Sequence, residues 1–206
     1  MRIAPVALRY RPRKSYHGSL EQLDMEGAQI AAITHGHSLG YMPAAVLSHI
    51  ISRILMDGKN RALKDIVAEA RDTIAKIFAG DSHLKELIRI INLAMELAQN
   101  DENDLDNIHR LGEGWVAEET LGIAIYCSLK YSTDFSAAMI AAVNHKGDSD
   151  STGAVTGNIV GALIGYDAIE EKWKKDLELH DVILEMAHGL CHGCTMDEYS
   201  HYSDPA

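Results

Sequence analysis

Residues 144–165 read NHKGDSDSTGAVTGNIVGALIG and join a short acidic turn to a helix-length apolar segment. In the apolar segment a glycine recurs every four residues, at Gly153, Gly157, Gly161 and Gly165. This spacing places the four glycines on one face of a helix. Because glycine costs up to about 1 kcal/mol relative to alanine inside a helix, the pattern indicates close packing of another backbone. We therefore predict a central bundle helix with Gly157 and Gly161 fully buried.

A membrane helix with a GxxxG face is the alternative interpretation of the same segment. However, Asn158 interrupts the apolar run, and polar turns bound the run before the roughly 20 residues that a membrane helix needs. The sequence favours a buried helix of a soluble protein, and we expect no membrane partner.

The acidic turn has two interpretations, which concern Asp148, Ser149, Asp150 and Ser151. In the first, their oxygens cap the helix, where carboxylates also suit the positive end of the helix dipole. In the second, the two carboxylates converge on a hard cation such as Mg²⁺ or Ca²⁺, which prefers carboxylate and hydroxyl ligands. By pattern alone capping is favoured, because D-x-D turns are common.

The composition narrows the class of protein. The 206 residues suffice for one sizeable core, and the scarcity of alternating Val, Ile and Thr predicts an all-α fold. A formal net charge of -11 at pH 7 repels phosphates, so we expect no nucleic-acid partner. Three cysteines, an odd number, and the lack of a charged and apolar leader indicate a reduced, cytoplasmic protein.

Two further segments carry side chains that could take part in catalysis or binding. His35 and His37 lie in a loop and could be paired metal ligands, catalytic groups or caps at the end of the preceding helix, of which capping is favoured. A polar loop at 101–115 leads into a helix whose first turn carries Glu118 and Glu119. The helix dipole explains these two acids, and a catalytic carboxylate is the alternative.

A cluster of zinc-competent residues lies near the end of the sequence, at His188, Cys191, His192, Cys194 and His201. Zinc sites normally show two well-spaced pairs, and adjacent Cys and His residues fit a tetrahedral site poorly. Structural or incidental use of these side chains is therefore favoured.

Several of these segments together resemble the ADP-ribosylglycohydrolase family. KGDSDSTG at 146–153 resembles the GGDTDT metal motif, with Lys146 in place of a glycine and serines in place of threonines. THGHSLGY at 34–41 resembles the THGHP motif, and GEGWVAEETLGIAIYCSLKY at 112–131 resembles a block that faces the ligand. The opening MRIAP resembles the family's substrate loop.

The resemblance implies a single-domain, orthogonal helical bundle over residues 1–206. It further implies a Mg²⁺-dependent hydrolase of the N- or O-glycosidic bond that joins ADP-ribose to a modified protein side chain or related compound. ADP-ribose or an ADP-ribosylated protein would be its partner. The resemblance assigns no catalytic residue in this sequence.

The resemblance also implies binding residues, in two groups. The ligands of a pair of Mg²⁺ ions would include Asp148, Asp150 and Ser151. The residues that contact ADP-ribose would include His35, Gly114 and Trp115.

The resemblance covers about the C-terminal two-thirds of the domain that is typical of the family. The family's N-terminal acidic loop and TDDT motif, which complete the metal pair, have no counterpart in residues 1–206. We therefore expect a bundle that lacks its N-terminal helices, at most a partial Mg²⁺ site, and no detectable hydrolysis. We also expect an exposed apolar patch over part of residues 1–8 and the flank of the glycine helix, which would promote self-association.

Two alternatives to an active enzyme follow. The first is a truncated, catalytically inactive relic of the fold that binds ADP-ribose or is purely structural. The second is a helical interaction protein without a ligand.

Overall fold

The computed structural model describes residues 1–9 and 19–192, and within these ranges it contains helices and no β-strand. The all-α class predicted from the sequence is confirmed. The α-helices are α1 (Ala4–Arg9), α2 (Leu20–Ala32), α3 (Ser38–Asp57), α4 (Leu63–Ile77), α5 (Leu84–Leu97), α6 (Asp104–Leu111), α7 (Ala117–Lys130), α8 (Phe135–Val143), α9 (Ser149–Ile164) and α10 (His180–His192). Short 3₁₀ turns form at η1 (Gly58–Asn60), η2 (Tyr166–Ala168) and η3 (Glu171–Trp173).

The chain divides into two compact units, residues 1–170 and residues 171–206. The second unit contains α10, on which the rings of His188 and His192 stack with their centroids 4.2 Å apart. The other members of the predicted zinc-competent cluster lie outside the described residues: Cys194, His201 and the side chain of Cys191.

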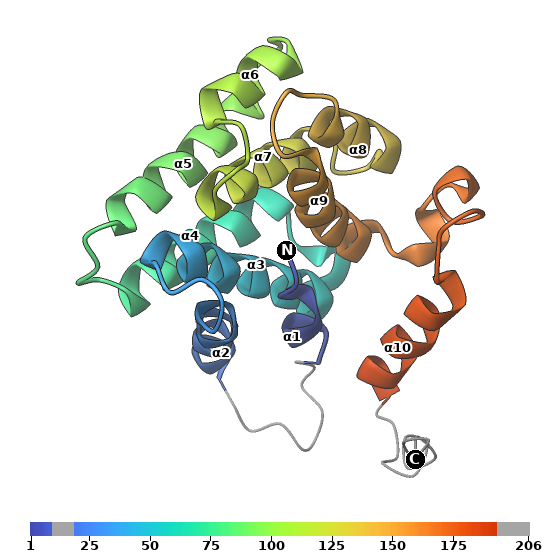
Figure 1. Cartoon of the computed structure of the whole chain (residues 1–206), viewed down its shortest axis with the longest axis horizontal. Coiled ribbons are helices and arrows are strands. Elements are labelled where there is room, and N and C mark those ends of the chain that lie inside the picture. Colours follow the sequence, from blue (N-terminus) through green and yellow to red (C-terminus); the bar gives the residue numbers. More distant parts are fainter. Residues whose placement is uncertain (10–18, 193–206) are drawn as a thin grey trace, which may run out of the picture. The chain divides into compact units, whose positions relative to one another are not determined.

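Helix α3 is the centre of the first unit and packs against α1, α2, α4, α7 and α9 (Figure 1). It begins where His37 Nδ1 accepts the N–H of Leu39 at 3.2 Å, and it ends at Gly58, whose φ is +59°. Among the described residues it is the one helix long and apolar enough to cross a membrane, but 67% of its apolar window is buried inside the protein. A core helix that is covered on several sides has this composition.

Helix α7 is a second internal helix, because it packs against α5, α8 and α9 as well as α3. Its residues Ile123, Ala124, Ile125, Tyr126 and Cys127 are fully buried. Burial raises the pKa of the Cys127 thiol, which makes this cysteine an unreactive core residue. Helices α4 and α5 bury one apolar face each and carry charges on the other, which is typical of outer helices.

Helix α9 corrects the prediction made for its glycine face. A Cβ added at Gly153 would lie 2.7 Å from Val143 Cγ1, whereas one added at Gly157 would lie 3.6 Å from Met139 Sδ, an ordinary contact. Nothing lies within 4 Å of a Cβ added at Gly161. The prediction that Gly157 and Gly161 are fully buried is therefore wrong, because α8 covers this face only as far as Gly157.

The N-terminal segment is buried in part. Ile3, Ala4 and Ala7 belong to the core, while the side chain of Met1 is 58% exposed. The Met1 carbonyl oxygen accepts a hydrogen bond from Asn158 Nδ2 at 3.5 Å, so the start of α1 lies beside the half-buried face of α9. Self-association through this surface stays a prediction.

Candidate functional site

The acidic turn at the start of α9 is held by hydrogen bonds between its own residues. Asp148 occupies the N-cap position, yet its side chain makes no capping hydrogen bond. Its Oδ2 instead accepts the hydroxyl of Ser151 at 2.8 Å. A hydrogen bond with the Asp150 side chain, followed by the one from Ser151, holds the pKa of Asp148 below its usual value. Ser151 thus contacts both acids, because Asp150 Oδ1 accepts the N–H of Ser151 at 2.7 Å while Asp148 accepts its hydroxyl.

The backbone of this turn is fixed by the loop that joins α6 to α7. The N–H of Asp148 donates to the carbonyl oxygen of Glu113 at 2.8 Å. A Cβ at Gly147 would overlap with that same carbonyl group, so the close approach requires glycine at this position. A Cβ at Gly114 would lie 2.8 Å from Thr152 Cγ2 and 3.5 Å from the Asp148 carbonyl oxygen. The structure thus brings Gly114 directly against the acidic turn.

Glu119 holds the α6–α7 loop in its shape. Its Oε2 accepts the N–H groups of Glu113 and Gly114, each at 3.1 Å. Gly112, with φ +128°, leaves room for this carboxylate, because a Cβ there would overlap with it. Sequence reasoning attributed Glu119 to the helix dipole and missed this anchoring role. The available signal was a Gly-x-Gly loop followed closely by an acid.

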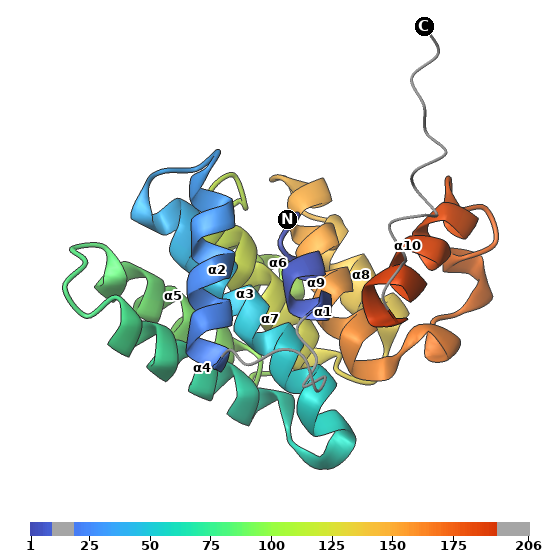
Figure 2. The same cartoon turned by 90° about the horizontal axis from the view of Figure 1, so that it is seen from below.

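The predicted substrate residues occupy different positions on this part of the molecule. Trp115 is 67% exposed, and its Nε1 donates to Glu113 Oε2 at 3.2 Å. His35 is exposed in the α2–α3 turn, where its Nδ1 lies 2.8 Å from Thr34 Oγ1. The α2–α3 turn, the α6–α7 loop and the start of α9 reach the same side of the unit, which is uppermost in Figure 2.

The α2–α3 turn contacts the residue before α5. The His37 ring lies 4.5 Å from the His83 ring. Burial raises the pKa of Glu118, which lies in the first turn of α7. Within the described ranges no hydrogen bond, ion pair or ring contact joins His35 to Gly114 or to the acidic turn. The structure therefore brings the acidic turn and Gly114 together and leaves His35 apart on the same side.

A cleft of about 620 Å³, which the sequence did not predict, lies beside the turn. Its walls are α6, the α6–α7 loop and the α8–α9 loop, and the polar lining includes Asp106, His109, Glu113, His145 and Lys146.

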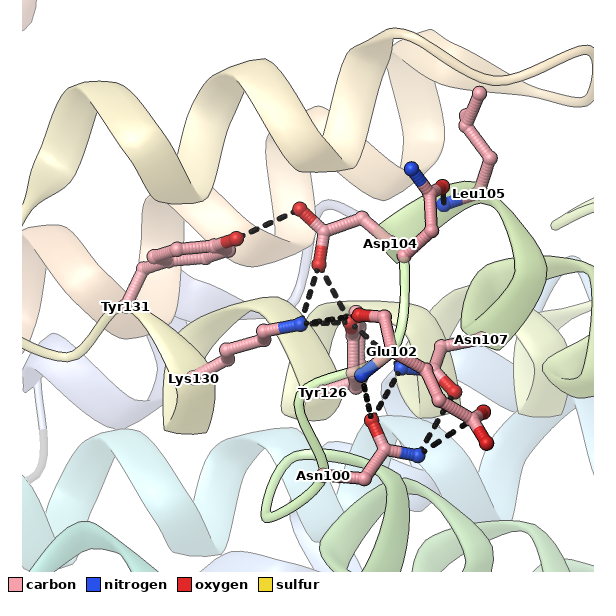
Figure 3. Close-up of polar contacts among 9 residues, drawn as sticks. Asn100, Glu102, Asp104, Leu105, Asn107, Tyr126, Lys130 and Tyr131 are labelled. Atoms are coloured by element: carbon pink, nitrogen blue, oxygen red, sulfur yellow. Dashed lines mark hydrogen bonds and ion pairs between the residues drawn. The ribbon is translucent and has the colours of Figure 1, made fainter.

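The α6 wall is anchored by one carboxylate at its start (Figure 3). Asp104 accepts the hydroxyls of Tyr126 at 2.5 Å and Tyr131 at 2.7 Å, and its Oδ1 lies 2.9 Å from Lys130 Nζ. Burial alone would raise the pKa of Asp104, but the hydrogen bonds from Tyr126, Tyr131 and Lys130 lower it. The network fastens α6 to the end of α7 and so fixes one side of the cleft.

A model of the ADP-ribosylglycohydrolase family matches residues 1–199. The chain belongs to the ADP-ribosylglycohydrolase family. The family and the all-α fold inferred from the sequence motifs are therefore confirmed. The specific roles given to His35, Gly114, Trp115 and the acidic turn stay predictions.

Relatives of this chain include proteins named ADP-ribosylhydrolase ARH3. An uncharacterized protein of Archaeoglobus fulgidus is 28% identical over 187 residues, which cover 91% of this chain and 55% of that protein. ADP-ribosylhydrolase ARH3 of Homo sapiens is 22% identical over an aligned length of 211 residues, and the alignment covers 91% of this chain and 56% of ARH3. The Bos taurus ARH3 is 21% identical over the same aligned length and shares. The chain thus spans little more than half the length of these relatives. No solved structure matches the chain.

Proposed function

We propose that this chain provides part of the active site of a Mg²⁺-dependent ADP-ribosylglycohydrolase. The reaction would be hydrolysis of the N- or O-glycosidic bond between ADP-ribose and a protein side chain or related compound. Family membership and the similarity to proteins named ADP-ribosylhydrolase ARH3 support this reaction class. The observation that carries the proposal is the clustering of Asp148, Asp150 and Ser151 in one turn at a helix start, where Asp148 Oδ2 accepts the Ser151 hydroxyl at 2.8 Å and is not used as a cap.

Two carboxylates in one short turn repel each other unless a proton or a cation lies between them. Asp148, Asp150 and Ser151 present oxygen atoms, which are the ligands that Mg²⁺ prefers. These three residues would hold the cation. When bound, Mg²⁺ would fix sugar hydroxyls and stabilise the negative charge that develops during hydrolysis.

The protein groups around the turn would then bind and orient the sugar nucleotide. Gly114 has no side chain, so its backbone can approach a ligand beside the acidic turn. The exposed ring of Trp115, which Glu113 orients, offers a flat apolar surface for an aromatic base or a sugar ring. His35 would contact the ligand from the α2–α3 turn on the same side.

The test separates binding from turnover. ADP-ribose is titrated calorimetrically into the chain with Mg²⁺ and then with EDTA, and we expect binding that requires Mg²⁺. The double variant Asp148→Asn, Asp150→Asn should lose that binding. The matched control is Asp72→Asn, because Asp72 is an exposed acid of α4 that pairs with Arg71. An absence of Mg²⁺-dependent binding by the wild-type chain would overturn the proposal.

Turnover is measured separately with ADP-ribosylated serine and arginine peptides, by release of ADP-ribose. Mg²⁺-dependent release that the double variant lacks supports the enzyme. Binding without release from either peptide favours the non-catalytic alternative.

A further inference from the structure

His145 lies three residues before Asp148 in the α8–α9 loop, and its two ring nitrogens have different partners. The N–H of Gly147 donates to Nδ1 at 3.1 Å, so Nδ1 presents a lone pair. A neutral imidazole with an unprotonated Nδ1 carries its proton on Nε2. Nε2 lies 2.9 Å from Thr152 Oγ1, and the ring therefore donates to that hydroxyl.

Thr152 extends this hydrogen-bond chain into the core. The residue is fully buried, and its hydroxyl has a single proton. Its nearest acceptor is the carbonyl oxygen of Ala142 at 2.7 Å, while those of Asp148 and Ser149 lie at 3.0 and 3.3 Å. The series of hydrogen bonds therefore runs from Gly147 through His145 and Thr152 to Ala142, at the end of α8.

This hydrogen-bond chain and the α6–α7 loop together hold the backbone that leads into Asp148. The N–H of Gly147 is bound to His145, and the N–H of Asp148 is bound to the Glu113 carbonyl oxygen. With two consecutive amides held in this way, the peptide that carries the first carboxylate has little freedom to rotate. Thr152 also lies in the first turn of α9, directly after Ser151. The hydrogen bonds of His145 and Thr152 therefore fix both ends of the acidic turn.

We propose that His145, held as the Nε2–H tautomer by Gly147 and Thr152, is a positioning residue that sets the direction of the Asp148 and Asp150 carboxylates. Its effect on a cation rests on the function proposed above, whereas the tautomer and the hydrogen-bond chain do not. Groups that orient metal ligands from outside the coordination shell typically change metal affinity by about 10- to 100-fold.

The first test addresses the tautomer in the metal-free chain. Long-range ¹H–¹⁵N correlation spectra distinguish a ring nitrogen that carries a proton from one that does not, and His145→Gln identifies the signals of His145. At pH 8 in EDTA we expect an unprotonated Nδ1 and a protonated Nε2. A proton on Nδ1 would overturn the proposal.

The second test addresses positioning and uses Mn²⁺ alone as the probe. Thr152→Val removes the hydroxyl and keeps the shape, while Thr152→Ser keeps the hydroxyl and serves as the matched control. His145→Asn retains an acceptor for Gly147 but cannot reach Thr152. We expect Thr152→Val and His145→Asn to weaken Mn²⁺ binding about 10-fold or more, and Thr152→Ser to stay near wild type.

Thermal unfolding of each variant separates positioning from a general structural role. If Thr152→Val lowers the melting temperature but binds Mn²⁺ like the wild-type chain, His145 and Thr152 only stabilise the fold and the inference is wrong. If the wild-type chain itself does not bind Mn²⁺, the metal function fails. In that case the spectra still decide whether the hydrogen-bond chain exists.

Discussion

The two halves of α9 use the same residue type in opposite ways. In the first half, Gly153 is buried, and a methyl group there would press against Val143. In the second half, a methyl group at Gly161 would meet open space. Glycine is required where backbones or side chains approach closely, but a four-residue repeat by itself does not show where that approach occurs.

The first half of α9, where Gly153 is covered, is the closed half, and the second half, where Gly161 is uncovered, is the open half. The closed half also holds the candidate site. Ser151 and Thr152 are buried there, and the α6–α7 loop is bonded to the turn through Asp148. The hydrogen bonds at the Asp148 N–H and at its Oδ2 reduce the number of directions its carboxylate can take. The open half contributes no residue to the site.

The largest effect is expected at Gly147, just before α9, where the acidic turn meets the α6–α7 loop. Gly147→Ala would place Cβ on the carbonyl group of Glu113, and because that group is backbone it cannot rotate away. We expect a loss of about 3 kcal/mol or more in the free energy of unfolding, the upper end for overpacked sites. The Mg²⁺-dependent binding of ADP-ribose should also be lost.

Urea unfolding and calorimetry measure these two effects. Gly80→Ala is the control, because nothing lies within 4 Å of a Cβ at Gly80. An unchanged unfolding free energy in Gly147→Ala would show that the α6–α7 loop does not press on the turn.

A smaller effect is expected at Gly153, where the neighbour is a side chain. Gly153→Ala places Cβ 2.7 Å from Val143 Cγ1, which can shift at some cost. The gain in helix propensity, up to about 1 kcal/mol, offsets part of the strain. We expect a net loss of about 1 kcal/mol, near the lower end for overpacked sites.

The double variant Gly153→Ala, Val143→Ala sharpens this prediction, because it removes the clashing methyl. Urea unfolding of the two single variants and the double variant gives the coupling energy. We expect the two substitutions to be less destabilising together than the sum of their separate effects. Simple additivity would contradict a contact between these two residues.

Much of the fold and part of the candidate site were predictable from the sequence. The scarcity of alternating Val, Ile and Thr predicted the all-α class, and the motifs around Asp148 and Gly114 located two segments that the structure brings together. Local patterns carry such information because they depend on neighbouring residues. The need for glycine at Gly147 could not be seen, because it arises from Glu113, which is distant in sequence.

The same limit explains what was wrong or missed elsewhere. The burial predicted for Gly161 depended on how far α8 extends along α9, and no local pattern records that length. The role of His145 depends on Thr152, whose hydroxyl points into the core only once α8 and α9 have packed. The spacing of residues in the sequence predicts which of them share one face of a helix. It does not identify the element that packs against that face.

The smallest effect, and the one of opposite sign, is expected at Gly161. Because nothing lies within 4 Å of an added Cβ, Gly161→Ala gains helix propensity without strain and should stabilise the chain by up to about 1 kcal/mol. For a protein of this size the melting temperature should rise by roughly 2–4 °C. Differential scanning calorimetry at low protein concentration measures this shift, with Gly153→Ala as the comparison of opposite sign.

The same variant shows whether the open face is covered by a second copy of the chain. Sedimentation velocity of the wild-type chain and of Gly161→Ala over a range of concentrations reports any self-association. If another copy packs closely on α9, the added methyl should weaken that association and cancel the gain in melting temperature at high concentration. A lower melting temperature at every concentration would mean that the two halves of α9 are equally closed, and the contrast between them would be lost.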